Sequence, residues 1–169
     1  MKKISLSGEW LLRQYTGEHR WMDIEDNSNN WLPAQVPGTV HQDLLRADVI
    51  PDPFRRLNEK EAAWVDEHDW LYLRKFELSE DFLNNSPAEL IFHGLDTYAE
   101  IALNGHLLGK SENMFTSWRR RVEAYLKPGH NVLAIRFSSA LQRVKNIAKE
   151  DNCPFIYGGS VIERGYARK

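Results

Sequence analysis

The pair Asn104-Gly105 lies between two short stretches in which apolar and polar residues alternate. Asn-Gly readily adopts the two positive φ angles of a type I′ turn, which connects adjacent antiparallel strands. The stretch before the pair puts Ala99, Ile101 and Leu103 on one side, as expected of a strand with one buried face. The sequence therefore predicts a β-hairpin over residues 98–110 and makes antiparallel β-structure the first expectation for the chain.

Further strands are predicted on both sides of this hairpin. The clearest is Asp69–Leu78, in which Trp70, Tyr72 and Phe76 share one face with Arg74 among them. Residues 88–95 are apolar on both faces, as in a central strand. Two other segments also read as strands, residues 4–13 and 132–137. At least six strands at roughly 8–15-residue spacing, without βαβ alternation, predict an all-β fold, an antiparallel β-sandwich.

Two short helices are expected between or after these strands. Thr39 can cap a helical turn that ends before Pro51, with Leu44 and Leu45 pointing inward. Ser139 and Gln142 fit a capping box at the start of an amphipathic helix. By contrast, residues 52–69 are charged and show no period, and long segments of this kind tend to be functional or interfacial.

Composition limits the classes of function. The 169 residues are 42% hydrophobic and 27% charged with a net charge of −2, so neither nucleic acid nor an anionic membrane is expected as a partner. The first ten residues lack the apolar core of a signal peptide, and no stretch approaches the ~20 apolar residues of a membrane helix. We therefore expect a cytoplasmic protein. Cys153 is the single cysteine, which excludes an intrachain disulfide and fits a half-buried structural thiol.

The residue types that carry catalysis do not form a recognisable constellation. The six histidines are far apart in the sequence, so we expect no metal site, and we expect no cofactor. Glycoside hydrolysis requires two carboxylates about 5–5.5 Å apart for retention, or farther apart for inversion. The sequence does not pair any two of the candidate carboxylates convincingly. These candidates are Asp52, Glu59, Glu61, Asp66, Glu67, Asp69, Asp96 and Glu100.

Several segments together resemble the N-terminal sandwich domain of glycoside hydrolase family 2, and most closely its β-mannosidase branch. They match in order and spacing along almost the whole chain: SLSGEWLL, VPGTVHQDLL, PDPFRRLNEKEAAWVDEHDWLYLRKFEL, LIFHGLDTYAEIALNGHLLGKSENMF and LKPGHNVLAIRF. The resemblance implies a jelly roll similar to galactose-binding domains, formed here by a single domain over residues 1–169.

The same resemblance implies that catalysis is housed elsewhere. Family members carry an immunoglobulin-like domain and a (β/α)₈ barrel after the sandwich, and the barrel holds both catalytic glutamates. We therefore expect an N-terminal portion of a larger glycosidase that continues beyond Lys169, with these two domains as partners. The implied reaction of the whole enzyme is retaining hydrolysis of terminal non-reducing β-D-mannosides, and no catalytic residue is predicted in this chain.

The loop over residues 52–69 is the segment that we expect to face the catalytic barrel. Its candidate residues are Asn58, Glu59 and Trp64. Asn58 and Glu59 form the same Asn-Glu dipeptide as the acid/base motif of the barrel. They lie in a loop of the sandwich, however, which argues against that catalytic role. The alternative for the segment is an ordinary surface loop with Trp64 packed on its own domain. For the whole chain, the alternative function is an autonomous carbohydrate-binding module.

Overall fold

The computed structural model describes residues 2–17, 20–22, 30–83 and 87–150. The strands that it defines are β1 (Gly8–Tyr15), β2 (Leu32–Val36), β3 (Asp69–Leu78), β4 (Glu89–Phe92), β5 (Tyr98–Leu103), β6 (His106–Ser111), β7 (Trp118–Arg121) and β8 (Gly129–Ser138). The helices are α1 (Val40–Arg46), α2 (Asn58–Ala62), α3 (Glu80–Leu83) and α4 (Ala140–Glu150), with 3₁₀ turns η1 (Ala63–Glu67) and η2 (Glu123–Tyr125). Cys153 and the segment that ends at Lys169 lie outside the described residues.

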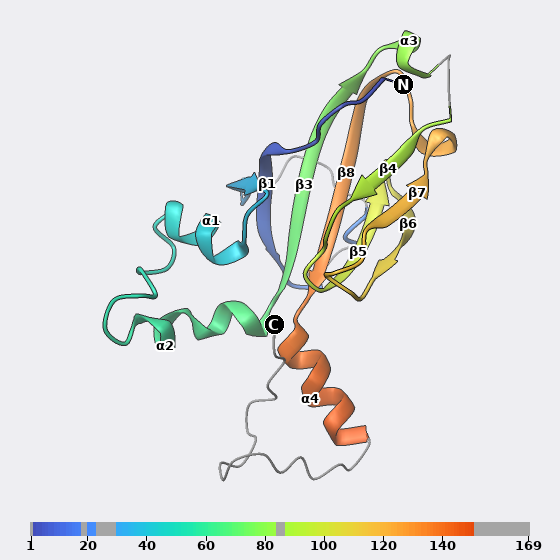
Figure 1. The fold of residues 1–169 in the computed structure, drawn as a ribbon. Helices are drawn as coiled ribbons and strands as arrows, with labels where there is room; N and C mark the ends of the chain where they lie inside the picture. The colour runs from blue at the N-terminus through green and yellow to red at the C-terminus, as the bar shows by residue number, and fades with distance from the viewer. Residues whose placement is uncertain (1, 18–19, 23–29, 84–86, 151–169) are drawn as a thin grey trace.

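The strands form two antiparallel sheets, which confirms the predicted fold class. The larger sheet has the order β2-β1-β3-β8-β5-β6, and the smaller one pairs β4 with β7. Figure 1 shows the smaller sheet beside the β8–β5 half of the larger one, while α1 and α2 project from the β1 side. The β5–β6 hairpin is confirmed, since Asn104 and Gly105 have φ angles of 50° and 80°.

One strand prediction was wrong in its position. Residues 88–95 were expected to form a central strand, but β4 covers only Glu89–Phe92 and pairs only with β7 within the described part of the chain. Leu90 and Phe92 pack against the core between the sheets. Ile91 points the other way and is half-buried, because successive side chains of a strand alternate. A strand with apolar residues on both faces therefore need not have a hydrogen-bonded strand along each of its two edges.

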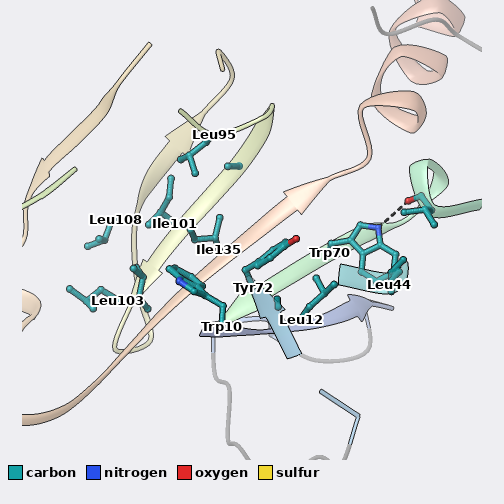
Figure 2. Packing of buried hydrophobic residues seen from close by; sticks show 14 of the residues in the cluster. Trp10, Leu12, Leu44, Trp70, Tyr72, Leu95, Ile101, Leu103, Leu108 and Ile135 are labelled. Atoms are coloured by element: carbon teal, nitrogen blue, oxygen red, sulfur yellow. Dashed lines mark hydrogen bonds between the residues drawn. The ribbon is translucent and has the colours of Figure 1, made fainter. Parts of the chain in front are cut away.

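Both faces of the larger sheet are covered by apolar side chains. The main cluster includes Trp10, Leu12, Tyr72, Ile101 and Ile135, which Figure 2 shows converging between the layers. A second cluster on the opposite face of the sheet contains Trp21, Leu71, Leu73, Ala102 and Ala134. This second cluster explains why four successive residues of β3 are buried, a pattern that period-two alternation alone does not predict.

Helix α1 forms where predicted, but one of its leucines points outward. The Thr39 side chain accepts a hydrogen bond from the Gln42 amide at 3.3 Å, which confirms the cap. Leu44 is buried, whereas Leu45 is 36% exposed. Adjacent residues of a helix are rotated by about 100° from each other, so Leu45 lies at the margin of the face that buries Leu44.

A buried carboxylate holds α1 against the sheet. Asp43 is fully buried and accepts hydrogen bonds from the Gln35 amide at 3.0 Å, from Arg46 Nη1 at 2.8 Å and from the Tyr72 hydroxyl at 3.0 Å. These contacts join α1, β2 and β3. Burial, followed by the charge of Asp43 and the hydrogen bond to it, raises the pKa of Tyr72 far above its usual value.

This shift predicts a loss of stability in alkali. The folded protein keeps the Tyr72 proton that the unfolded chain releases above pH about 10, so the contribution is complete below that pH and falls as the pH rises through it. We expect the stability of the wild type relative to Tyr72→Phe to fall by about 1 kcal/mol between pH ~9 and ~11. Urea unfolding of both proteins across this range measures the difference, and parallel stability curves would contradict it.

The start of α4 is tied to the start of β3. Ser139 Oγ accepts a hydrogen bond from the Gln142 amide at 3.0 Å, as the predicted capping box requires. The Ser139 amide, however, donates to Asp69 Oδ1 at 2.8 Å, so Asp69 takes the position that the box assigns to the Gln142 side chain. The Ser139 hydroxyl also donates to the Asp66 carbonyl oxygen at 2.6 Å. Three elements, η1, β3 and α4, therefore meet at one serine.

Candidate functional site

The predicted site segment, residues 52–69, begins with a loop that is held by hydrogen bonds among its own residues. Asn58 Nδ2 donates to the Asp52 carbonyl oxygen at 2.9 Å, and the Asn58 amide donates to the Arg55 carbonyl oxygen at 3.1 Å. Asp52 in turn accepts the Phe54 amide on its side chain at 3.0 Å. The half-buried Asn58 side chain thus fixes the shape of the loop, and its amide group is engaged within its own segment.

Glu59 and Trp64 occupy different surroundings. Glu59 is exposed in the first turn of α2, and its side chain makes no hydrogen bond or ion pair within the described residues. Trp64 is half-buried in η1, with its ring centroid 5.9 Å from that of Trp70 and 5.7 Å from that of His68. The Trp64 ring therefore packs on its own domain, while Glu59 faces solvent.

Of the eight candidate carboxylates, Asp69 and Glu100 meet on one cation. Arg136 Nη2 lies 2.7 Å from Asp69 Oδ2, and Arg136 Nη1 lies 3.3 Å from Glu100 Oε2. Glu100 also pairs with Lys110 at 2.7 Å. All four side chains belong to strands, so the ion pairs join β3, β8, β5 and β6 rather than lining a reaction centre.

A shallow concavity of about 290 Å³ lies beside this network. Its charged lining residues include Glu100, Lys110, Glu112, Arg136 and Arg143. Arg143 pairs with Glu112 at 2.6 Å, and its guanidinium lies 4.1 Å from the centroid of the Tyr98 ring. Glu100 is therefore paired with Lys110 and Arg136, and Glu112 is paired with Arg143. Arg143 also covers one face of Tyr98, the one aromatic ring in the lining. Sequence reasoning missed this concavity, because its residues come from four separate elements.

No group of three or more histidine, cysteine, aspartate or glutamate side chains is placed to hold a metal ion within the described part of the chain. No helix in the same part is both long and apolar enough to cross a membrane.

Comparison with known proteins identifies the domain. The profile of one protein family, described as "Glycosyl hydrolase 2 galactose-binding domain-like", matches residues 10–169. The chain belongs to this family. The glycosyl hydrolase 2 assignment confirms the resemblance predicted from the sequence, and the galactose-binding-like description agrees with the two-sheet architecture.

Individual relatives of this glycosyl hydrolase 2 domain are named β-mannosidases. β-Mannosidase B of Aspergillus terreus is 39% identical over 132 residues, which cover 76% of this chain and 16% of the relative. The β-mannosidase of Bos taurus is 34% identical over 136 residues, or 80% of this chain and 14% of the relative. The solved structure of the β-D-mannosidase of Dictyoglomus thermophilum is 38% identical with a TM-score of 0.80, covering 95% of this chain and 18% of that one. The chain thus spans less than a fifth of each of these proteins.

Proposed function

We propose that this chain is the non-catalytic N-terminal domain of a β-mannosidase. The observation that carries the proposal is the 38% identity and TM-score of 0.80 to a solved β-D-mannosidase over 95% of the chain. The reaction of the whole enzyme would be retaining hydrolysis of terminal non-reducing β-D-mannose residues in carbohydrate metabolism, through a covalent mannosyl-enzyme intermediate. We propose a cytoplasmic location for it.

The geometry of the acidic side chains supports a non-catalytic role. A retaining glycosidase needs one carboxylate free to attack and a second one free to donate a proton, about 5–5.5 Å apart. Asp69 and Glu100 are instead engaged by Arg136, and Glu112 is engaged by Arg143. The resemblance to glycoside hydrolase family 2 implies that the catalytic carboxylates would come from a (β/α)₈ barrel, connected through an immunoglobulin-like domain of the same polypeptide.

The role of this domain would be to wall one side of the active site. A rigid sandwich beside a catalytic domain narrows the pocket and excludes water from it. The segment over residues 52–69 is our candidate for the face toward the barrel. In that arrangement Asn58 would hold the loop in shape, Trp64 would anchor it to the sandwich, and the exposed Glu59 would face the neighbouring domain.

An autonomous carbohydrate-binding module is the second candidate. It is favoured by two highly exposed aromatic side chains, Phe54 and Phe115, because aromatic faces can stack on sugars. The concavity beside Arg136 supports it poorly, since Arg143 covers a face of Tyr98. Calorimetric titration with mannose and mannobiose separates the two candidates: millimolar or tighter binding favours the module, and absence of heat favours the structural domain.

Activity assays test the first candidate directly. The polypeptide that extends this chain to the length of its relatives is expected to hydrolyse p-nitrophenyl β-D-mannoside, and the 169-residue chain is expected to be inactive. p-Nitrophenyl β-D-glucuronide is the control substrate, because it carries a different sugar and so tests whether the hydrolysis is specific for the mannoside. Hydrolysis by the 169-residue chain alone, or a preference of the longer polypeptide for the glucuronide, would contradict the proposal.

A further inference from the structure

Exposed apolar side chains gather in one connection of the fold. Seven large hydrophobic side chains are exposed in the described part of the chain, and four of them lie between residues 45 and 57. Phe54 is 97% exposed and Leu57 is 63% exposed. Both lie in the loop that leads into α2, on the flank of the molecule away from β4 and β7 (Figure 1).

The loop that carries Phe54 and Leu57 is held at both ends. Ile50 before it and Ala62 and Val65 after it are buried in the main core cluster. Between these anchors, Asp52 accepts hydrogen bonds from the amides of Phe54 and Arg55, and from the side chain of Asn58. The backbone that carries the two exposed side chains is therefore held in one conformation. The loop loses little further conformational freedom when a partner covers these side chains.

An apolar contact, rather than a sugar, fits this surface best. A sugar site needs polar groups that converge beside the aromatic ring, but the polar groups of Asp52 and Asn58 are used inside the loop. The exposed neighbours Arg55, Arg56, Glu59 and Lys60 carry both signs of charge. Apolar anchors at the centre with mixed charges around them are the usual composition of a protein–protein interface.

We propose that Phe54 and Leu57 are the apolar contact through which this domain packs on the rest of its own polypeptide. The partner follows from length: each of the three relatives described above is more than five times as long as the part that matches, so most of such a polypeptide lies outside this chain. This inference rests on the proposed function, because that function supplies the neighbouring domain. It assigns the contact to two side chains that sequence reasoning did not select.

Radical footprinting of the longer polypeptide tests the contact. Side chains exposed to hydroxyl radicals are oxidised, and mass spectrometry locates the oxidised residues. Phe54 is expected to be labelled at least about tenfold less in the folded polypeptide than in the free peptide of residues 50–60, because the neighbouring domain covers it. Labelling within about twofold of the free peptide would overturn the proposal, as would protection that appears only when the protein concentration is raised.

A paired substitution provides the second measurement. In the longer polypeptide, Phe54→Ser with Leu57→Ser is expected to increase protease cleavage between this domain and the next by about tenfold, because the domains separate more often. Phe115→Ser is the matched control, since Phe115 is 85% exposed but lies between β6 and β7, and its rate is expected to stay within about twofold of the wild type. Circular dichroism checks that all variants are folded, and an unchanged cleavage rate for the double variant would overturn the proposal.

The outcomes separate this inference from the proposed function. Protected Phe54 without β-mannosidase activity in the same preparation would reject the function and retain the contact. Activity with fully labelled Phe54 would reject the contact and retain the function.

Discussion

Replacing Asp43 with alanine is expected to lower the free energy of unfolding by about 2–4 kcal/mol. The carboxylate is fully buried, and its removal leaves the Tyr72 hydroxyl and the Gln35 amide without an acceptor. The third donor, Arg46, has a side chain that is 54% exposed, so water can replace its lost partner. Most of the effect therefore comes from the hydroxyl of the buried Tyr72.

Urea unfolding followed by tryptophan fluorescence measures this loss. Asp66→Ala is the matched control, because the Asp66 side chain is exposed and only its backbone oxygen takes part in the capping of α4. We expect the control to change stability by less than about 0.5 kcal/mol. Tyr72→Phe should cost about 2 kcal/mol, because it leaves Asp43 Oδ2, an oxygen of a fully buried carboxylate, without its donor. A loss below 1 kcal/mol for Asp43→Ala would show that Asp43 does not hold α1 in place.

Replacing Asn131 with alanine is the second large effect, and we expect a loss of about 3 kcal/mol. Asn131 is fully buried, and its side chain accepts from the Lys127 amide at 3.1 Å and from Asn104 Nδ2 at 2.8 Å. Its own amide group donates to the carbonyl oxygens of Lys127 and Gly129. One side chain therefore shapes the turn before β8 and also holds the β5–β6 hairpin.

Asn113→Ala is the control for this prediction. Asn113 also accepts a backbone amide, that of Phe115 at 2.9 Å, but it does so in an exposed loop. The same substitution there should cost less than about 1 kcal/mol. Thermal unfolding of the two variants gives the comparison, and similar losses at both positions would mean that burial of the network adds nothing.

Local patterns predicted the elements whose structure depends on nearby residues. The Asn104-Gly105 turn and strand β3 formed as expected, because turn conformation and alternation are properties of a few adjacent residues. The caps of α1 and α4 also formed, through Thr39 and Ser139. Sequence therefore defined most strands and the fold class.

Contacts between distant segments were not predictable in the same way. Nothing near Asp43 in the sequence indicates that a carboxylate will be buried, because its partner Tyr72 lies 29 residues away. Likewise, β4 has the composition of a central strand, but its pairing depends on which strands come to lie beside it. Tertiary packing decides both features.

The candidate site stays a prediction. The sequence singled out the connection between β2 and β3, and the structure shows that Asn58 and Trp64 shape this connection and anchor it to the sandwich. Whether Asn58, Glu59 or Trp64 lies near a substrate stays a prediction. Phe54 and Leu57 could not be distinguished from core residues in the sequence, because an apolar residue in an aperiodic segment gives no sign of its exposure.

The dependence of α4 on Asp69 has a consequence for the order of folding. The amide that begins this helix finds its acceptor 70 residues earlier in the chain, at the first position of β3. A ribosome releases the earlier residue long before the later one, so the helix can acquire its final orientation only after β3 and β8 have come together. The direction in which the backbone leaves the sandwich is thus among the last features of the domain to be established during synthesis.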